Sequence, residues 1–213
     1  GLDHRGGEGA PEVDLDGMRV VHRVNKDELW DRSPRLLADL DRANEALQQL
    51  DDLAAVLGCG CHAGGAEELG EKLGVKIIGP HKDDLPLLSG LEAQAKMFGL
   101  EMDVRNVAPD QWLDDGDKVS FGVHEFEVLH TPGHAPGHVI YFNRAEGFAH
   151  LGDVLFAGSI GRTDLPGGDH QTLLNSIRDK VFPLGDETGF ICGHGPGGKI
   201  GEERRTNPFL KGL

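Results

Sequence analysis

The sequence predicts one domain of mixed strands and helices, in the α/β or α+β class. The chain has 213 residues, which is within the range of a single domain and enough for a hydrophobic core. Short apolar runs of strand length alternate with stretches of helical periodicity. Three of the apolar runs end in a histidine or an aspartate beside glycine, so polar side chains are expected where strands pass into loops.

The composition excludes several classes of function. With 21 Lys and Arg residues against 36 Asp and Glu residues, the formal net charge is −15, which opposes binding to nucleic acid or to an anionic membrane. No apolar run approaches the length of a membrane span, and no secretory signal pattern opens the chain. Three cysteines, an odd number, argue against a disulfide framework and for a reducing compartment, so we expect a cytoplasmic protein.

The first quarter of the chain is predicted to contain a loop, a short strand and a helix. Residues 1–17 are expected to be a loop or frayed terminus, and residues 18–24 a short strand. Ser33 and Pro34 suit the N-cap and the first position of a helix. The apolar residues that follow alternate at steps of four and three, as on one face of an amphipathic helix: Leu36, Leu40, Ala43, Leu47, Leu50, Ala54 and Leu57.

From residue 66 onward the pattern is more regular. Residues 66–73 are predicted to form a helix closed by Gly74, residues 75–78 a buried strand, and residues 91–98 a second short helix. A turn at residues 115–117 is expected to precede two strands, whose inward-facing residues would be Val119, Phe121, Val123, Phe126 and Val128. Asp169 suits the N-cap of a further helix. A lone turn histidine, His81, is expected to be solvated, and His124 and His130 are expected at strand edges.

The stretch from Leu129 to Asp153 carries the clearest chemical signal. It contains two Pro-Gly-His units four residues apart, and because Pro and Gly force tight turns, the histidines are expected on loops. Asp153 follows the next apolar runs, and His194 ends a later one. Neutral imidazole and carboxylate are common zinc ligands, so His134, Asp153 and His194 are candidates for one metal site. Any one of these histidines could instead be an ordinary surface residue.

From Gly64 to the C-terminus the sequence resembles the metallo-β-lactamase superfamily, and within it the short glyoxalase II-like hydrolases. The resemblance rests on ordered motifs at residues 131–138 (TPGHAPGH), 152–156 (GDVLF), 161–169 (GRTDLPGGD), 193–196 (GHGP) and 207–210 (NPFL). It implies an α+β fold of the αββα sandwich type, in which helices cover two mixed sheets. We therefore expect one domain over residues 1–213, in which residues 1–56 are divergent and partly helical.

The resemblance also implies a site for one or two zinc ions, although iron or manganese would tolerate the same ligands. His134 and Asp153 would be catalytic, with Asp153 bridging, and His62 and His194 would complete the second metal position. The family motif His-x-His-x-Asp-His is altered, because its first three ligands fall on Leu57, Cys59 and Cys61. Cys59 and Cys61 are candidate thiolate ligands or simply small loop residues, whereas Leu57 cannot coordinate a metal.

The activity that the resemblance implies is hydrolysis of a small-molecule thioester, such as a hydroxyacylglutathione, by hydroxide that the metal makes available. Arg162 would contact the substrate, or would pair with Asp164 or Asp169 instead. Two alternatives remain open. One is a persulfide dioxygenase with a single iron ion, and the other is a metal-impaired family member that acts as a binding protein.

Overall fold

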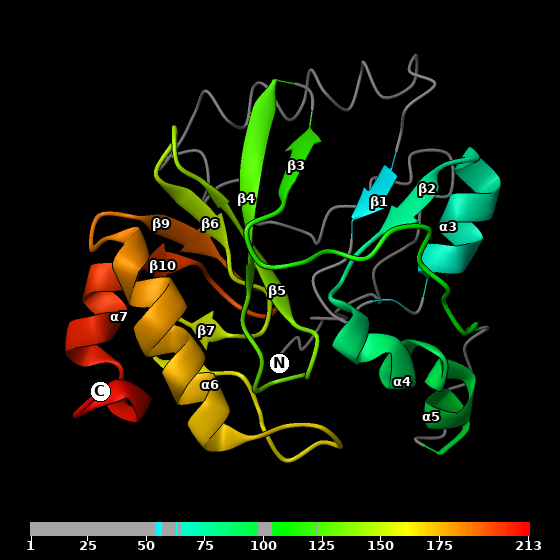
Figure 1. Cartoon of the computed structure of the whole chain (residues 1–213). Coiled ribbons are helices and arrows are strands. Elements are labelled where there is room, and N and C mark those ends of the chain that lie inside the picture. Colours follow the sequence, from blue (N-terminus) through cyan, green and yellow to red (C-terminus); the bar gives the residue numbers. More distant parts are fainter. Residues whose placement is uncertain (1–53, 57–62, 64, 98–103, 122) are drawn as a thin grey trace, which may run out of the picture.

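The structure is a computed structural model that describes residues 54–56, 63, 65–97, 104–121 and 123–213. The elements expected before residue 54 and the candidate ligands Cys59, Cys61 and His62 lie outside the described residues. No helix in the described part of the chain is long and apolar enough to cross a membrane. Figure 1 shows the arrangement of the elements.

The largest sheet has six strands in the order β10-β9-β6-β5-β4-β3. Its strands are β3 (Lys118–Phe121), β4 (His124–His130), β5 (Val139–Asn143), β6 (Phe148–His150), β9 (Gly189–Ile191) and β10 (Gly198–Lys199). A hairpin of β7 (Leu155–Phe156) and β8 (Ser159–Ile160) lies apart from it. The described helices are α3 (Ala66–Leu73), α4 (Leu85–Leu88), α5 (Leu91–Met97), α6 (His170–Ser176) and α7 (Ile200–Thr206).

A second sheet contains two described strands, β1 (Ala54–Val56) and β2 (Lys76–Ile78), which pair in parallel. The helix that the apolar periodicity up to Leu57 predicts is therefore wrong at residues 54–56, which form a strand. Pairing with β2 is a contact between residues far apart in sequence, and it outweighs a local pattern of apolar spacing. The helix α3 has the predicted bounds, and Gly74 ends it in the left-handed conformation with φ of 65°.

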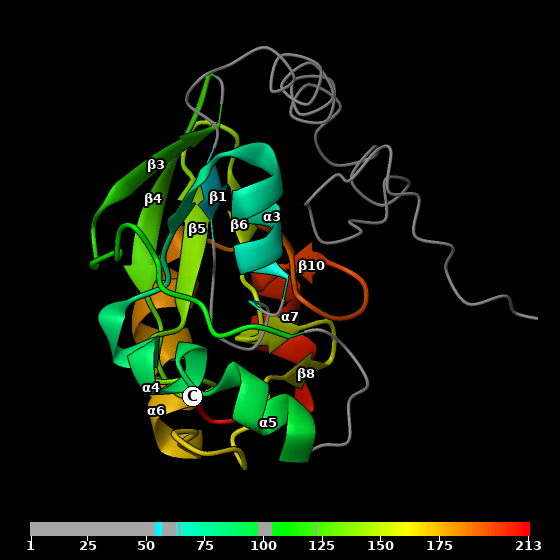
Figure 2. The same ribbon diagram turned by 90° about the vertical axis from the view of Figure 1, so that its right-hand side faces the viewer.

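Apolar side chains alternate along β5 and separate the two faces of the large sheet. Ile140 and Phe142 pack in the cluster that contains α6 and α7, whereas Val139 and Tyr141 pack on the opposite face with Ile78 of β2. A third cluster joins β2 to α3, α4 and α5. The described layers therefore run helix, sheet, sheet, helix, with α6 and α7 on one outer side and α3 on the other (Figures 1 and 2).

Two details differ from the sequence prediction in this region. Val123 was expected to share the inward face with Val119, but it lies in the turn before β4 and is 88% exposed. The short helix α4 was not predicted, because four residues are too few to show a helical period. The predicted helix over residues 91–98 is confirmed as α5, within the residues that the structure describes.

The direction of the strands brings three loops to one edge of the large sheet. Both β4 and β6 are antiparallel to β5, and β9 is parallel to β6, so β4, β6 and β9 all run the same way. Their C-terminal ends consequently lie at the same edge, where the chain continues into the loops that carry His134, Asp153 and His194.

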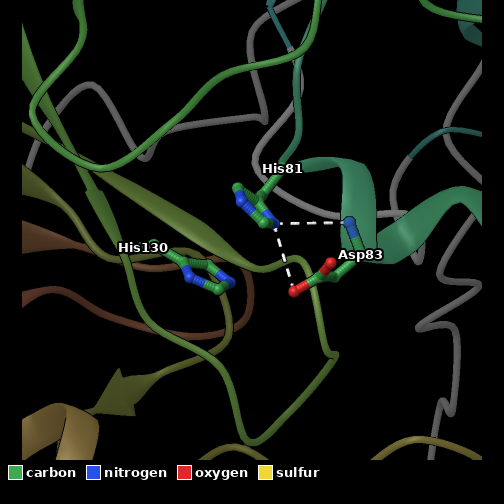
Figure 3. A group of neighbouring side chains, drawn as sticks. All are labelled: His81, Asp83 and His130. Carbon is green, nitrogen blue, oxygen red and sulfur yellow. Dashed lines mark hydrogen bonds and ion pairs between the residues drawn. The ribbon is translucent and has the colours of Figure 1, made fainter.

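The turn after β2 contacts the loop after β4 through hydrogen bonds and ring stacking. The backbone N–H of His81 donates to the carbonyl of Gly137 at 3.1 Å, and the N–H of Gly137 donates to the carboxylate of buried Asp84. Gly137 is required here, because a Cβ would come within 2.5 Å of the Asp84 nitrogen and the His81 carbonyl oxygen. The ring of His81 also stacks on that of His130 at the end of β4 (Figure 3).

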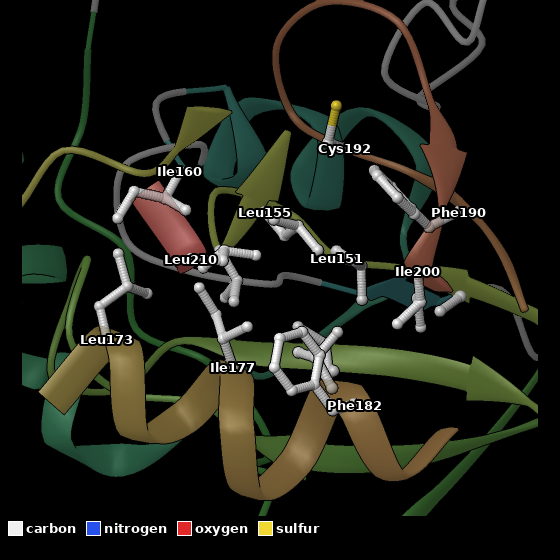
Figure 4. Packing of buried hydrophobic residues seen from close by; sticks show 14 of the residues in the cluster. Leu151, Leu155, Ile160, Leu173, Ile177, Phe182, Phe190, Cys192, Ile200 and Leu210 are labelled. Atoms are coloured by element: carbon white, nitrogen blue, oxygen red, sulfur yellow. The ribbon is translucent and has the colours of Figure 1, made fainter. Parts of the chain in front are cut away.

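The main core lies between the large sheet and α6 (Figure 4). Leu173 and Ile177 are fully buried and point from the helix toward the sheet layer. Asp169 caps the helix as predicted, since its carboxylate accepts from the N–H of Thr172 at 2.7 Å. This packing fixes the start of α6, where the N–H of Asp169 donates to the carbonyl of Gly133 in the loop that presents His134.

Candidate metal centre

The site contains one carboxylate between two imidazoles. Asp153 Oδ2 lies 3.4 Å from His134 Nε2 and 3.5 Å from His194 Nε2. Asp153 and His134 are buried, whereas the side chain of His194 is 70% exposed. The structure thus brings together the three side chains that the sequence singled out, with one side open to solvent. Their role as metal ligands stays a prediction.

These spacings suit a shared cation. Two ligands bound to a tetrahedral zinc at about 2.0–2.2 Å are roughly 3.3–3.6 Å apart. The two nitrogen–oxygen distances of 3.4 and 3.5 Å are within that range. Both are longer than the roughly 2.7–2.9 Å expected of a hydrogen bond between imidazolium and carboxylate.

A backbone contact fixes which nitrogen of His134 can bind a cation. Its Nδ1 lies 2.9 Å from the carbonyl oxygen of Arg162, which can only accept a hydrogen bond, so Nδ1 carries the proton. In the neutral ring, Nε2 then presents a lone pair to the carboxylate of Asp153. Two electron-rich atoms facing each other in a buried position are stabilised by a cation between them. The donor set therefore fits a metal ion, and the Arg162 carbonyl orients its histidine.

His138, for which the sequence predicted no role, holds the Asp153 loop in place. The ring is fully buried, and Nε2 accepts from the backbone N–H of Asp153 at 3.0 Å. The proton is consequently on Nδ1, which lies 3.2 Å from the hydroxyl of Thr131. Gly152 has φ of 49°, and a Cβ there would lie 2.6 Å from His138 Nε2. The second Pro-Gly-His unit was the signal that could have identified this residue.

The remaining loop is tied to the Asp153 loop by backbone contacts. The N–H of Leu151 donates to Ile191 and the N–H of Gly193 donates to Gly152, each at 2.8 Å. Cys192 is buried, and its thiol faces the carbonyls of the turn that carries His194, at 3.1 Å for His194 itself. Gly161 lies directly against the Asp153 carbonyl, where a Cβ would collide. The loops that carry His134, Asp153 and His194 therefore support one another through these contacts.

The side chain of Arg162 is paired with Asp164 through two contacts of 2.8 Å, from Nε to Oδ1 and from Nη2 to Oδ2. This is one of the two arrangements expected from the sequence, and the guanidinium is 60% exposed. The hydrogen bond from Arg162 lowers the pKa of Asp164 to about 2, and the same contact raises the pKa of Arg162. The ion pair is therefore intact throughout the neutral range.

Cys59, Cys61 and His62 lie outside the described residues, so the structure does not place these candidate ligands. The nearest described residue, Ala63, is fully buried in the cluster that joins α3 to β2. The assignment of these three residues to the site stays a prediction.

Comparison with known proteins identifies the family. Residues 62–194, more than half of the chain, match the metallo-beta-lactamase superfamily. The chain belongs to this superfamily, and its α+β sandwich is that family's fold. Hydroxyacylglutathione hydrolase GloC of Haemophilus influenzae is 44% identical over 150 residues, which are 70% of each protein. The family and this relative make the chain a hydrolase of the glyoxalase II-like group.

Two solved structures are similar over most of their length. TTHA1623, solved in a di-iron-bound form, is 38% identical with a TM-score of 0.68, covering 83% of this chain and 85% of that one. BLEG-1, described as a B3 metallo-beta-lactamase, is 36% identical with a TM-score of 0.68, covering 84% of this chain and 85% of that one. One of these two similar proteins, TTHA1623, has therefore been solved with iron bound.

Proposed function

We propose that this protein is a metal-dependent thioesterase that hydrolyses a hydroxyacyl thioester of glutathione. The observation that carries the proposal is the position of the Asp153 carboxylate, which lies 3.4 Å from His134 Nε2 and 3.5 Å from His194 Nε2. The three residues come from three loops at one edge of the large sheet. The 44% identity to a hydroxyacylglutathione hydrolase supports the choice of substrate class. The acyl group of the substrate is left open by this argument.

His134, Asp153 and His194 would hold the metal, and His62, Cys59 and Cys61 would complete the set. A zinc or iron ion held by these residues would supply hydroxide at neutral pH and Lewis-acid activation of the substrate carbonyl. Hydrolysis adds water to that carbonyl carbon and breaks the carbon–sulfur bond, which gives a carboxylic acid and free glutathione. The Arg162 carbonyl and His138 keep the His134 ring and the Asp153 backbone in position for this reaction.

Arg162 would recognise a carboxylate of the glutathione moiety. Its guanidinium is exposed, and its backbone carbonyl contacts His134, so the residue lies beside the candidate metal centre. The planar fork that now faces Asp164 has the geometry that a substrate carboxylate requires. Substrate binding at this position would exchange one carboxylate partner for another.

The test is a hydrolysis assay on the full chain loaded with zinc or iron, with a hydroxyacylglutathione as substrate and release of free thiol as the readout. We expect turnover that exceeds the rate of the Asp153→Asn variant by at least about 10–100-fold, the loss typical of groups that only orient a ligand, because the variant lacks the proposed bridging carboxylate. Glu187→Gln is the matched control, since Glu187 is 91% exposed and belongs to no donor group described above. Thioester turnover equal in the unmodified protein and in Asp153→Asn would refute the proposal.

The two alternatives predict different results in the same experiment. A persulfide dioxygenase would consume oxygen with glutathione persulfide and leave the thioester intact. A metal-impaired binding protein would turn over neither substrate, and the triple change Leu57→His, Cys59→His and Cys61→Asp would then raise both metal content and thioesterase activity. The altered residues of this motif are the specific observation that keeps the second alternative open.

A further inference from the structure

A second group of metal-ligand residues lies outside the Asp153 site. In the described part of the chain, His81, Asp83 and His130 each offer one ligand-type atom, and these three atoms all lie within 4.8 Å of one another (Figure 3). His81 and Asp83 come from the turn after β2, and His130 is the last residue of β4. None of the three belongs to the His134, Asp153 and His194 set.

The first two members already have the spacing of metal ligands. His81 Nδ1 lies 3.3 Å from Asp83 Oδ2, within the roughly 3.3–3.6 Å expected between two ligands of a tetrahedral zinc ion. The ring of His81 stacks on the ring of His130 with centroids 4.1 Å apart and an interplanar angle of 21°. The lone pairs of stacked rings do not converge, so a shared ion would require the His130 ring to tilt out of the stack about its Nε2 contact with the Pro136 carbonyl.

The contacts of His81 place the lone pair of its neutral ring on Nδ1, the nitrogen that faces Asp83. Its Nε2 lies 3.3 Å from Asp114 Oδ1, an acceptor that keeps the proton on Nε2. Its Nδ1 accepts from the backbone N–H of Asp83 at 3.3 Å, so Nδ1 carries the lone pair, and a bound ion would take the place of this long hydrogen bond. A carboxylate on the far nitrogen of a histidine is the usual arrangement behind a metal-binding imidazole, because it fixes the tautomer and raises the basicity of the ligand.

The environment of His130 is also suitable. Its Nε2 lies 2.9 Å from the Pro136 carbonyl, which keeps that nitrogen protonated and leaves the lone pair of the neutral ring on Nδ1. Its backbone N–H donates to Asp115, whose other oxygen is neutralised by Lys180 at 2.7 Å. The side chains of Asp83 and Asp114 are 52% and 75% exposed, so an ion can reach the group from solvent.

We propose that His81, Asp83 and His130 form a second binding site for a divalent transition-metal ion of the zinc class, in which Asp114 orients His81. Two imidazoles and one carboxylate suit such ions better than calcium or magnesium, which prefer oxygen ligands. Because Pro136 and Gly137 contact this group, an ion here would also fix the loop that presents His134. The proposal does not depend on the thioesterase activity.

The test is zinc binding by the full chain after removal of metal with a chelator, measured by equilibrium dialysis with elemental analysis. We expect the unmodified chain to bind one more zinc ion per chain than His81→Gln or Asp83→Asn. Asp114→Asn should keep the number of ions but weaken this site by about 10-fold, as is typical for loss of the group behind a ligand. The exposed His170→Gln and Glu187→Gln are matched controls and should bind as the unmodified chain does.

Thermal unfolding of the metal-free forms shows whether each variant folds. Asp83→Asn keeps the test decisive if His81→Gln fails to fold, because the Asp83 side chain is half exposed and its removal disturbs no packing. An unmodified chain and an Asp83→Asn variant that bind equal numbers of zinc ions with equal affinity would overturn the proposal, and so would equal affinity of the Asp114→Asn variant. The expected difference between the unmodified chain and the Asp83→Asn variant concerns this second site, because His134 and Asp153 are unchanged in both.

Discussion

The imidazole of His138 is fully buried between the hydroxyl of Thr131 and the backbone N–H of Asp153. A buried N–H without an acceptor costs free energy, because it has lost its contact with water. His138 therefore stabilises the backbone position that carries the Asp153 carboxylate. It is a positioning residue, because its Nε2 accepts from the Asp153 backbone and its ring meets that of His134 edge to face, with centroids 6.0 Å apart.

Replacing His138 by Ala should destabilise the metal-free protein by roughly 1–3 kcal/mol, because the Asp153 N–H is left without its acceptor. Metal affinity should fall by about 10–100-fold, as for other groups that orient a ligand. Denaturant unfolding and zinc titration measure the two effects. His138→Gln retains an acceptor and should restore part of both, whereas His170→Ala, at an exposed position, should change neither. Unchanged metal affinity in His138→Ala would contradict the positioning role.

Arg162 offers a separate prediction about the substrate. If its guanidinium binds a substrate carboxylate, Arg162→Ala should raise KM for an anionic thioester about 10-fold or more and leave kcat nearly unchanged, because ground state and transition state lose the same contact. Steady-state kinetics with a glutathione thioester and with an uncharged thioester separate the two parameters. Asp164→Asn is the control, because it frees the fork from its present partner. A KM for the glutathione thioester that is the same in Arg162→Ala as in the unmodified protein would show that the ion pair with Asp164 is purely structural.

At the scale of single elements, α6 connects the core to the site. Leu173 lies fully buried against the large sheet, and its backbone faces Gly133, where a Cβ would collide with it. Ser176 on the same helix donates to the Pro132 carbonyl at 2.7 Å. The loop that presents His134 is therefore positioned by the helix that covers the sheet.

Leu173→Ala should lower the free energy of unfolding by about 2–5 kcal/mol, because it leaves a cavity in a fully buried position. Leu85→Ala is the matched control, since Leu85 is helical but 51% exposed, and its effect should stay within about 0.5 kcal/mol. Urea unfolding followed by far-UV circular dichroism gives both values. Equal effects of the two substitutions would contradict the packing described for α6.

Elements with a strong local signal were predictable, and those defined by distant contacts were not. Helix α3 has a left-handed glycine at its end and α6 has an aspartate cap, so both could be recognised from sequence. Strand β1 could not, because its pairing with β2 is made across more than twenty residues and its own three residues suit a helix equally well. Val123 was misplaced because it lies in the turn before β4, whereas the alternation of apolar residues placed it on a strand.

For the whole molecule, the parallel directions of β4, β6 and β9 explain why three motifs far apart in sequence lie at one edge. The motifs themselves could be found in the sequence, and their order gave His134, Asp153 and His194. The second Pro-Gly-His unit marks His138 in the sequence, but its contact with the Asp153 N–H depends on the fold. The proximity of His81, Asp83 and His130 could not be found in this way, because only the fold brings their elements together. A lone histidine in a turn has no distinguishing local pattern.

The most direct test of the proposed metal site is the number of metal ions that the chain retains with and without the Asp153 carboxylate. The full chain and the Asp153→Asn variant are loaded with zinc, dialysed against metal-free buffer, and compared by elemental analysis in parallel with their circular dichroism spectra. The account predicts that the folded variant retains at least one ion fewer per chain, because Asp153 is the carboxylate shared by His134 and His194. Equal metal content in two folded proteins would contradict the assignment of this site and the function proposed from it.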